Sequence, residues 1–415
     1  MSYTQRRKSC GTKGRECDGC KMGTKTQSFS MPQSTKRQRK NGVGGIMDDE
    51  GVWQEEPETV ENIILDYFKS IFSSNQPSNF DASLEAMDRR VTSEMNQALL
   101  KEFRAEEVWN ALKQMHPTKS PSLDSMSPIF YQKYWDIIGP SVSNCILQTL
   151  NTGIMPRGIN DTYICMIPKT KNPLKITNYR PISLCNVIYK LISKVLANRL
   201  KKILHSVINE AQSAFVPGRL IKNNVVVAFE TMHSIAKRKK GKVRSMAIKL
   251  DMSKAYDRVE WAYLGSMRKM GFEEKWISLI MMCVTMASFS VLINGEPRGT
   301  ITPSRGLLQG DPISPYLFLL CTEGLTTLLR KKEAVGLIRG VAVSRLAPSI
   351  LHLFFVNDCI IFCRATMEEC KQLASVLEVY EKESRQKQNR EKTSLFFSKN
   401  KKEDIQNFVN DTFGA

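Results

Sequence analysis

The sequence is poor in histidine and has no long apolar runs. Four isolated histidines occur, which excludes an HExxH zinc motif and gives no nuclease-like cluster: His116, His205, His233 and His352. No apolar stretch reaches the roughly 18 residues that a membrane span requires, and residues 1–30 lack the apolar core of a secretory signal. The eleven cysteines form no regular framework, which is typical of free thiols in a reducing compartment. We therefore expect an intracellular protein, in the nucleus or cytoplasm, without a membrane segment and not secreted.

Acidic residues are also scarce: 41 Asp and Glu face 60 Lys and Arg, giving a formal net charge of +19. Such an excess favours a polyanionic partner, most often nucleic acid, and a solvated basic surface without a partner is the alternative. Residues 1–45 contain eleven Lys and Arg but two acids and few large apolar residues, which predicts a basic disordered tail. Its run at 36–40 is compatible with phosphate contacts, with a nuclear address or with plain solvation. A closed zinc site needs four ligands, and the tail offers three cysteines: Cys10, Cys17 and Cys20.

The apolar pattern predicts a mixture of helices and short strands. Apolar residues three and four apart indicate amphipathic helices over 60–68, 105–115, 128–152, 187–207, 316–331 and 367–380. Short apolar runs indicate strands over 162–167, 245–251, 289–294, 299–301, 351–355, 359–363 and 394–397. The helix at 187–207 carries a basic set of side chains: Lys190, Lys194, Arg199, Lys201 and Lys202. Because helices and strands do not alternate regularly and no repeat occurs, we predict an α+β fold.

Two acidic residues lie at the end of a predicted strand and in a predicted turn, where carboxylates can bind metal ions. Asp251 closes an apolar strand, and Asp358 lies in the tight turn of a hairpin about a hundred residues later. Two carboxylates brought side by side on one sheet can hold Mg²⁺ (or Mn²⁺) ions for phosphoryl or nucleotidyl transfer. A strand-end acid and a turn-capping acid without any joint role are the simpler interpretation of these two residues alone.

The surrounding blocks decide between these interpretations. Leu250-Asp-Met-Ser-Lys-Ala-Tyr-Asp-Arg258, Gly306-Leu-Leu-Gln-Gly-Asp-Pro-Ile-Ser-Pro-Tyr-Leu-Phe318 and Phe354-Phe-Val-Asn-Asp358 follow one another. Upstream stand Ile167-Pro-Lys169, the block 178–190 and Ala211-Gln-Ser-Ala-Phe-Val-Pro-Gly-Arg219. In order and spacing these blocks resemble the fingers segment and motifs A, B and C of LINE-type (non-LTR) retrotransposon reverse transcriptases, in the form abundant in plants. The resemblance covers roughly residues 100–400.

The resemblance implies a right-hand polymerase that copies an RNA template from a DNA primer with deoxynucleoside triphosphates. It places the metal ligands at Asp251, Asp358 and the backbone carbonyl of Met252. It makes Tyr256 the residue that rejects a 2′-hydroxyl, and Gln309 and Gly310 the residues near the nascent base pair. Lys169 and Arg180 match the cations that grip the triphosphate, and Lys392 matches the motif D general acid. Each of these residues, taken alone, is also compatible with an ordinary structural role.

The chain departs from that family at several positions. Asn357 replaces the first motif C aspartate and offers one carbonyl oxygen without charge, so we expect impaired catalysis. Two loop glycines are absent from 119–125, and a turn glycine is replaced by Arg385. Leu308 stands where a basic residue is usual, and Asn223 stands where an acid is expected. The endonuclease and ribonuclease H segments of such polyproteins find no match here.

These observations predict a basic tail over 1–45, a helical N-terminal extension over 46–155, fingers over 156–245 and a palm over 246–400. The palm is expected to be an antiparallel sheet with helices on one face. Residues 401–415 are expected to begin a truncated thumb, so that the thumb is missing or vestigial. The predicted function is that of an RNA-directed DNA polymerase domain impaired by Asn357. The alternative is a catalytically inactive nucleic-acid-binding remnant.

Overall fold

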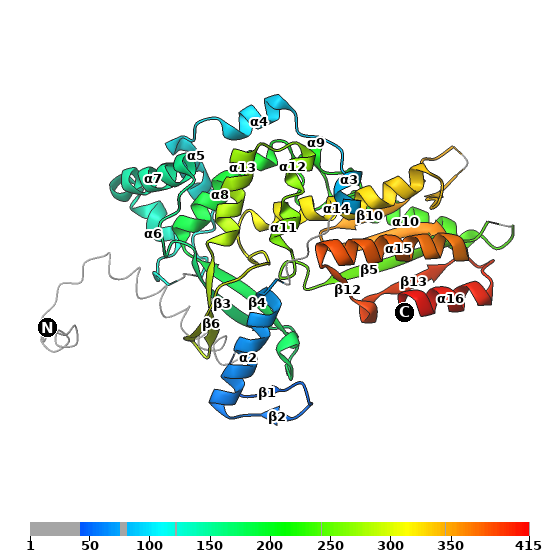
Figure 1. The fold of residues 1–415 in the computed structure, drawn as a ribbon, viewed down its shortest axis with the longest axis horizontal. Helices are drawn as coiled ribbons and strands as arrows, with labels where there is room; N and C mark the ends of the chain where they lie inside the picture. Colours follow the sequence, from blue (N-terminus) through cyan, green and yellow to red (C-terminus); the bar gives the residue numbers. More distant parts are fainter. Residues whose placement is uncertain (1–41, 75–80, 121–122, 242, 345, 415) are drawn as a thin grey trace, which may run out of the picture.

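The computed structural model describes residues 42–74, 81–120, 123–241, 243–344 and 346–414. Most of the predicted basic tail, with the run at 36–40 and its three cysteines, lies outside these residues. Within them, helices and sheets are mixed without a repeating βαβ pattern, so the α+β prediction is confirmed at this level. Figure 1 shows a group of helices on the left, the five-stranded antiparallel sheet with its helices on the right, and the four-stranded sheet below and between them.

The first sheet has the order β4-β3-β6-β7. It consists of β3 (Asp161–Pro168), β4 (Tyr179–Cys185), β6 (Ser288–Ile293) and β7 (Glu296–Ile301). β3 pairs antiparallel with β4 and parallel with β6, and β6 and β7 form a hairpin. The strands predicted at 162–167 and 289–301 are therefore present.

The second sheet has the order β10-β11-β5-β12, with β13 also paired to β5. Its strands are β5 (Ser245–Ser253), β10 (His352–Phe355), β11 (Asp358–Arg364), β12 (Lys387–Gln388) and β13 (Ser394–Phe397). All pairings are antiparallel. Because side chains alternate between the two faces of a strand, Met246, Ile248 and Leu250 enter the large hydrophobic core, while Ala247 faces a small cluster with Ile235 and Phe362.

Two long helices belong to the large core beneath this sheet: α14 (Ser314–Ala334) and α15 (Met367–Ser384), which pack against each other. The hydroxyl of Thr366 accepts a hydrogen bond from the Glu369 amide and so fixes the start of α15. The opposite face is contacted by α10 (Ile221–Lys237), which packs on β10 and β5. The sheet therefore has helices on both faces, and the prediction of helices on one face is wrong. The end of the sheet where β12 pairs with β5, next to Asp251, faces the middle of the molecule (Figure 1).

The remaining helices surround this frame. They are α2 (Pro57–Phe72), α3 (Asp81–Ala86), α4 (Ser93–Leu100), α5 (Ala105–Lys113), α6 (Pro128–Lys133), α7 (Trp135–Thr152), α8 (Val187–Lys201), α9 (Leu204–Val207), α11 (Trp261–Leu264), α12 (Met267–Met270), α13 (Glu274–Thr285) and α16 (Glu403–Phe413). Short elements complete the fold: β1 (Ile46–Met47), β2 (Trp53–Gln54), β8 (Val341–Ala342), β9 (Ser349–Ile350) and the 3-10 turns η1 (Ile176–Asn178) and η2 (Arg390–Lys392).

The helices before residue 155 are part of the common core. α3 packs on α14, α4 packs on α8 and α13, and α5 packs on α8. Val108 and Leu112 of α5 are fully buried in the same cluster as the strands of the second sheet. Residues 46–54 form a β1–β2 hairpin, which is a local exception to the predicted helical character of this region.

The predicted basic helix at 187–207 differs from the structure in two ways. It is divided into α8 and α9 by a turn at Lys202 and Ile203. Lys190 and Arg199 are buried on α8 although their charges suggested a solvated face. The polar pattern was misleading here because buried acceptors from other segments compensate the Arg199 cation.

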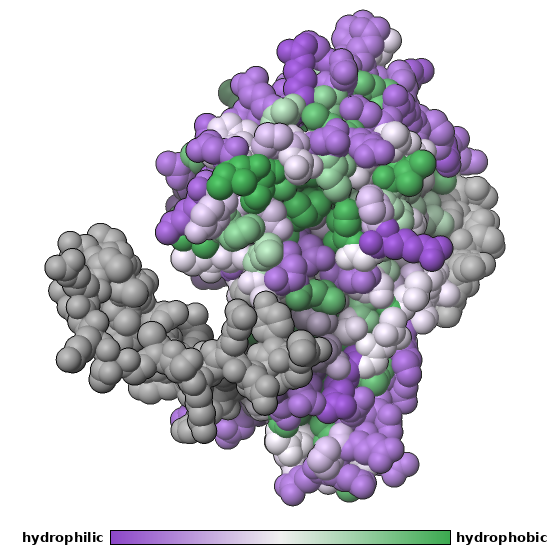
Figure 2. Space-filling model, turned by 90° about the vertical axis from the view of Figure 1, so that its left-hand side faces the viewer, coloured by the Kyte–Doolittle hydropathy of each residue, from purple (hydrophilic) through white to green (hydrophobic). Residues whose placement is uncertain are grey.

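The outer face of the helical group carries apolar side chains. Figure 2, which views the left-hand side of Figure 1, shows green hydrophobic patches between purple polar ones. The exposed apolar residues here include Ile129 of α6, Ile137 of α7 and Tyr134 between the two helices. Among the described helices, none combines the length and the apolar character needed to traverse a bilayer.

Candidate active site

The two predicted aspartates lie opposite each other on neighbouring strands. Asp251 of β5 is the register partner of Asp358 of β11, so both side chains emerge on the same face of the sheet. Asn357 lies in the two-residue turn between β10 and β11, next to Val356, whose φ of 59° is left-handed. This conformation is unusual for a β-branched residue, and it directs Asn357 toward β5.

Both carboxylate oxygens of Asp251 already have partners. The Asn357 amide donates to Asp251 Oδ1 at 3.0 Å. The Lys392 ammonium lies 3.2 Å from Asp251 Oδ2, and the Asn389 amide donates to that same oxygen at 3.4 Å. The Asn389 backbone N–H also donates to the Asp251 carbonyl at 2.8 Å. Two side-chain amides and one cation therefore surround the carboxylate of Asp251.

A large cleft opens beside this pair. Its volume is about 1360 Å³, and it separates the two sheets. Nine of the ten predicted site residues line it: Asp251, Met252, Asn357, Lys392, Lys169, Arg180, Tyr256, Gln309 and Gly310. Asp358 does not line the cleft and is exposed at the start of β11. The structure thus brings nine of the predicted residues together around one cleft and leaves Asp358 outside it.

Cations dominate the lining of the cleft. Ten Lys and Arg residues line it, against five carboxylates. Lys169 donates to the Thr177 carbonyl at 2.9 Å. Burial lowers the pKa of Lys169, and the nearby positive charge of Arg180 lowers it further. An electropositive, partly enclosed cleft of this kind attracts phosphates and can hold them.

The motif B turn is joined to the first sheet. The Ser183 amide of β4 donates to the Gln309 carbonyl at 2.9 Å. Gly310 has a φ of 112°, and a Cβ there would approach the Ser183 carbonyl oxygen to 3.3 Å. Glycine is therefore required at this position on conformational grounds. Tyr256 stacks on Phe318 at a centroid distance of 5.0 Å, which fixes its ring at the cleft wall.

Sequence reasoning passed over three residues of the cleft. Asp257 is buried and accepts a hydrogen bond from the Gln309 side chain at 3.2 Å. Burial raises the pKa of Asp257 to about 6, and burial with the neighbouring Arg258 lowers the pKa of Lys254 to about 8. The Lys254 ammonium lies 4.3 Å from the centroid of the Tyr67 ring. The quoted block 250–258 contained the signal, since it holds two further cations and an acid beside Tyr256.

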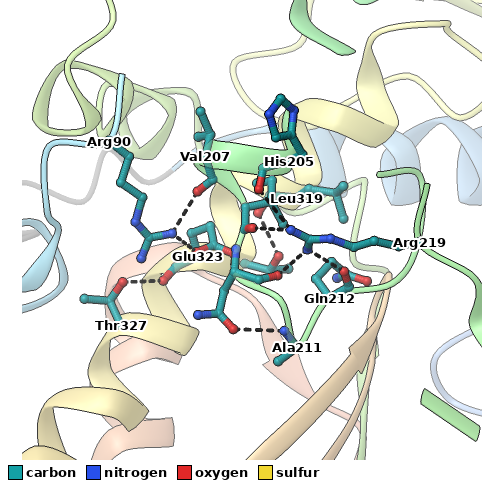
Figure 3. A network of polar contacts seen from close by, with 12 residues as sticks. Arg90, His205, Val207, Ala211, Gln212, Arg219, Leu319, Glu323 and Thr327 are labelled. Atoms are coloured by element: carbon teal, nitrogen blue, oxygen red, sulfur yellow. Dashed lines mark hydrogen bonds and ion pairs between the residues drawn. The ribbon is translucent and has the colours of Figure 1, made fainter. Parts of the chain in front are cut away.

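A polar network around the segment 205–212, shown in Figure 3, supports the turn that carries Asn357. Gln212 Oε1 accepts from the Val356 amide at 3.2 Å and from the Ala214 amide at 3.0 Å. Arg219 donates to four backbone carbonyls of the segment 205–212. Because hydrogen bonds from a charged donor are stronger than neutral ones, Arg219 holds this segment in place.

The same network reaches the N-terminal helices. Arg90 donates to Glu323 Oε2 and to the Val207 carbonyl, while Glu323 Oε1 accepts from the Asn209 backbone N–H at 3.0 Å. Figure 3 shows Arg90 and Glu323 approaching the segment from one side and Arg219 from the other. The position of the Asn357 turn thus depends on residues far from the cleft.

Two of the substituted glycine positions adopt the backbone conformation that glycine favours. Ser125 has a φ of 55° and Arg385 a φ of 57°, and left-handed backbone costs a non-glycine residue roughly 1–2 kcal/mol. We predict that Arg385→Gly raises the free energy of unfolding by about 1 kcal/mol after the entropy cost of glycine is included. Urea unfolding checks this value.

The control for Arg385→Gly lies one turn earlier in α15. Lys382→Gly places glycine at an exposed helical position and should lower the free energy of unfolding by about 0.5–1 kcal/mol. A destabilising Arg385→Gly would contradict the expected relief of strain.

Asp311 provides a test of the electrostatics near the cleft. It is buried, it accepts from the hydroxyls of Ser193 and Ser314, and burial raises its pKa to about 6 from an ordinary 3.8. A raised folded-state pKa means that the folded protein binds the proton more tightly. Its contribution to stability is therefore complete below about pH 4 and is lost as the pH rises through about 6.

We predict that Asp311→Asn reduces the loss of stability between about pH 4 and 7. The difference from wild type can reach about 3 kcal/mol, since one pKa unit corresponds to about 1.4 kcal/mol. Urea unfolding over this pH range is the measurement, with the surface variant Asp88→Asn as control. Equal pH profiles for wild type and Asp311→Asn would contradict the assignment.

With the geometry established, comparison with known proteins defines the class. The sequence matches the reverse transcriptase (RNA-dependent DNA polymerase) family over residues 167–407. The chain belongs to this family, as its motifs predicted.

Similar individual proteins come from mobile elements. The chain is 30% identical over 317 residues to the uncharacterized 149 kDa protein of transposon TX1 from Xenopus laevis, covering 75% of this chain and 24% of that protein. It is 24% identical over 309 residues to the Pol polyprotein of the type-2 retrotransposable element R2DM from Drosophila melanogaster, covering 74% of this chain and 27% of that protein. An uncharacterized mitochondrial protein of Arabidopsis thaliana is 55% identical over 67 residues, covering 16% of this chain and 55% of that protein.

These relatives confirm the prediction of a non-LTR retrotransposon reverse transcriptase domain. The chain spans about a quarter of the length of the TX1 and R2DM proteins.

Proposed function

We propose that the chain binds primer–template nucleic acid in its cleft and that its nucleotidyl transfer is impaired by Asn357. The observation that carries this proposal is the 3.0 Å hydrogen bond from the Asn357 amide to Asp251 Oδ1. A donor group occupies the place where the family pattern has a carboxylate. Lys392 supports the same conclusion, because its ammonium group faces the other Asp251 oxygen.

Members of the family generally use divalent metal ions, and the residues at this site fit a metal pair poorly. Two carboxylates are present, Asp251 and Asp358, and the amide of Asn357 stands between β10 and β11. The described part of the chain contains no group of three His, Cys, Asp or Glu residues arranged to hold a metal ion. Mg²⁺ is a hard cation that prefers near-octahedral oxygen coordination, so weak binding of Mg²⁺ or Mn²⁺ is part of the proposal.

The remaining cleft residues support binding of nucleotide and template–primer. Lys169 and Arg180 project from the first sheet and would contact a triphosphate. Tyr256 would lie against the sugar, and Gln309 and Gly310 against the nascent base pair. In this assignment residues 156–245 are the fingers and 246–400 the palm. Action inside the cell, in the nucleus or cytoplasm, belongs to the same proposal.

A primer-extension assay tests the proposal. Wild type should bind an RNA template annealed to a DNA primer with a steep salt dependence and extend the primer slowly or not at all. The second candidate function is an active RNA-directed DNA polymerase, which the family membership favours. Rapid extension by wild type would establish this second function and refute impairment.

A further inference from the structure

A cluster of exposed lysines lies at the end of the second sheet that is remote from Asp251. The sequence 237–244 contains six Lys and Arg in eight residues, and it joins α10 to the start of β5. The turn after β13 adds more cations. The exposed members, named the distal lysine cluster, are Lys237, Lys239, Lys240, Lys399, Lys401 and Lys402.

Asn400 holds the two segments of the cluster together. Its side-chain amide donates to the carbonyls of Gly241 and Val243, both at 3.0 Å, and its backbone N–H donates to the Arg238 carbonyl at 3.3 Å. Arg244 Nε donates in return to the Asn400 carbonyl at 3.1 Å. Lysines from positions about 160 residues apart in the sequence are thus fixed on one surface.

The charge of this surface is not compensated locally. Within the described residues, none of the six lysines forms an ion pair with a carboxylate. The neighbouring acids are Glu403 and Asp404 in the first turn of α16, where the helix dipole favours a negative charge. An excess of positive charge without an internal partner favours an external polyanion.

The distal lysine cluster is separate from the cleft. β5 begins at Ser245, beside the cluster, and Asp251 lies six residues further along the strand, so that at about 3.3 Å per residue the two positions are roughly 20 Å apart. Figure 1 shows the loop between α10 and β5 at the right-hand margin of the molecule, away from the end of the sheet that carries β12. Between them, a groove of about 540 Å³ follows β13 and includes Lys401.

We propose that the distal lysine cluster binds the phosphate backbone of the nucleic acid at a second place, outside the cleft. The inference rests on the proposed function, in which the cleft holds template–primer. A separation of roughly 20 Å corresponds to about six phosphates of one duplex strand, so one nucleic acid molecule can reach both places. Contacts of this type hold the position of a duplex and carry no base specificity.

Fluorescence anisotropy with the full chain tests the inference. Two labelled DNA duplexes are compared, one that just fills the cleft and one longer by about 12 base pairs, twice the estimated reach along β5 at 3.4 Å per pair. The variant combines Lys239→Gln, Lys399→Gln and Lys402→Gln. Its affinity for the long duplex should fall toward that for the short one, and its log–log salt slope should become shallower by about 0.9 for each lysine engaged.

A matched control carries the same charge change elsewhere. Lys133, Lys269 and Lys275 are exposed on α6, α12 and next to the start of α13, and their triple Gln variant should bind the long duplex as wild type does. Arginine at Lys239, Lys399 and Lys402 should preserve binding. Thermal unfolding of each variant confirms that it folds.

Three results would overturn the inference. The cluster variant and the control variant could bind the long duplex equally, or wild type could show no preference for the longer duplex. Polyglutamate of equal charge could also compete as well as DNA, which would identify a site for any polyanion. These assays contain no nucleotide, so a protein that never extends a primer can still pass them. Failure of the wild-type protein to bind the short duplex would instead refute the proposed role of the cleft.

Discussion

Replacing Asn357 by aspartate is expected to raise the rate of primer extension by about a thousandfold or more. The new carboxylate would stand beside Asp251 and next to the exposed Asp358 along the chain, giving three acids where two are present. A charge contact at about 4 Å is worth about 4 kcal/mol at an effective dielectric constant near 20. Each 1.36 kcal/mol changes a rate tenfold, which gives the expected factor. Single-turnover extension of a labelled primer in Mg²⁺ measures it.

A second asparagine provides the matched control. The Asn389 amide also lies beside Asp251, at 3.4 Å from Oδ2, so Asn389→Asp adds the same charge from the opposite side. This variant should remain as slow as wild type if the position of the carboxylate is decisive. Wild type extending at a rate close to that of Asn357→Asp would show that the amide does not impair the site.

The thermal stability of the Asn357→Asp variant should depend on the metal ion. Three neighbouring carboxylates repel one another, so Asn357→Asp should melt at a lower temperature than wild type in a chelator. A ligand that binds the folded state stabilises it by mass action, so Mg²⁺ should restore this loss in the variant and change wild type little. Equal responses of both proteins to Mg²⁺ would contradict the poor metal fit of wild type.

Arg199→Met is expected to lower the free energy of unfolding by about 3–5 kcal/mol, because it removes a buried guanidinium that pairs with the half-buried Glu107 and bonds to three carbonyls. The Arg199 guanidinium donates to both Glu107 oxygens, at 2.9 and 2.7 Å, and to the carbonyls of Leu99, Lys101 and Glu102. It also lies 3.6 Å from the centroid of the Phe103 ring. Methionine keeps the packed stem and leaves these acceptors without their donor.

Urea unfolding compares Arg199→Met with a surface counterpart. Arg268 pairs with Glu274, and both side chains are about 60% exposed. Arg268→Met should cost less than about 1 kcal/mol, as is typical of exposed pairs. A loss below about 1 kcal/mol for Arg199→Met as well would show that the buried contacts contribute little net stability.

The sequence was sufficient to predict strands and helices whose apolar residues recur at a regular spacing and whose ends are marked by turn residues. The strand ending at Asp251 and the hairpin at 351–363 were found because short apolar runs flank a polar turn. The cleft residues were found through their ordered blocks, and nine of ten line one cavity. The burial of Arg199 could not be predicted, because its acceptors come from a segment about 100 residues earlier. The distal lysine cluster was missed for the same reason, since Asn400 joins two distant segments.

The conformation of Arg385 and Ser125 illustrates a middle case. The absence of glycine at these positions was visible in the sequence, and the left-handed backbone explains what glycine would have contributed. The partners of Asp251 could not be foreseen, because they depend on the side-chain directions of Asn357, Asn389 and Lys392.

The packing of α5 against α8 has a consequence for how such domains can be exchanged between mobile elements. The family match begins at residue 167, yet Glu107 supplies the carboxylate for the buried Arg199, and Val108 and Leu112 fill the core above α8. A recombination event that transferred only the matched segment would uncover this apolar surface and strand a buried cation. The stable structural unit is therefore longer than the segment that carries the motifs, and it includes α5, which lies before that segment.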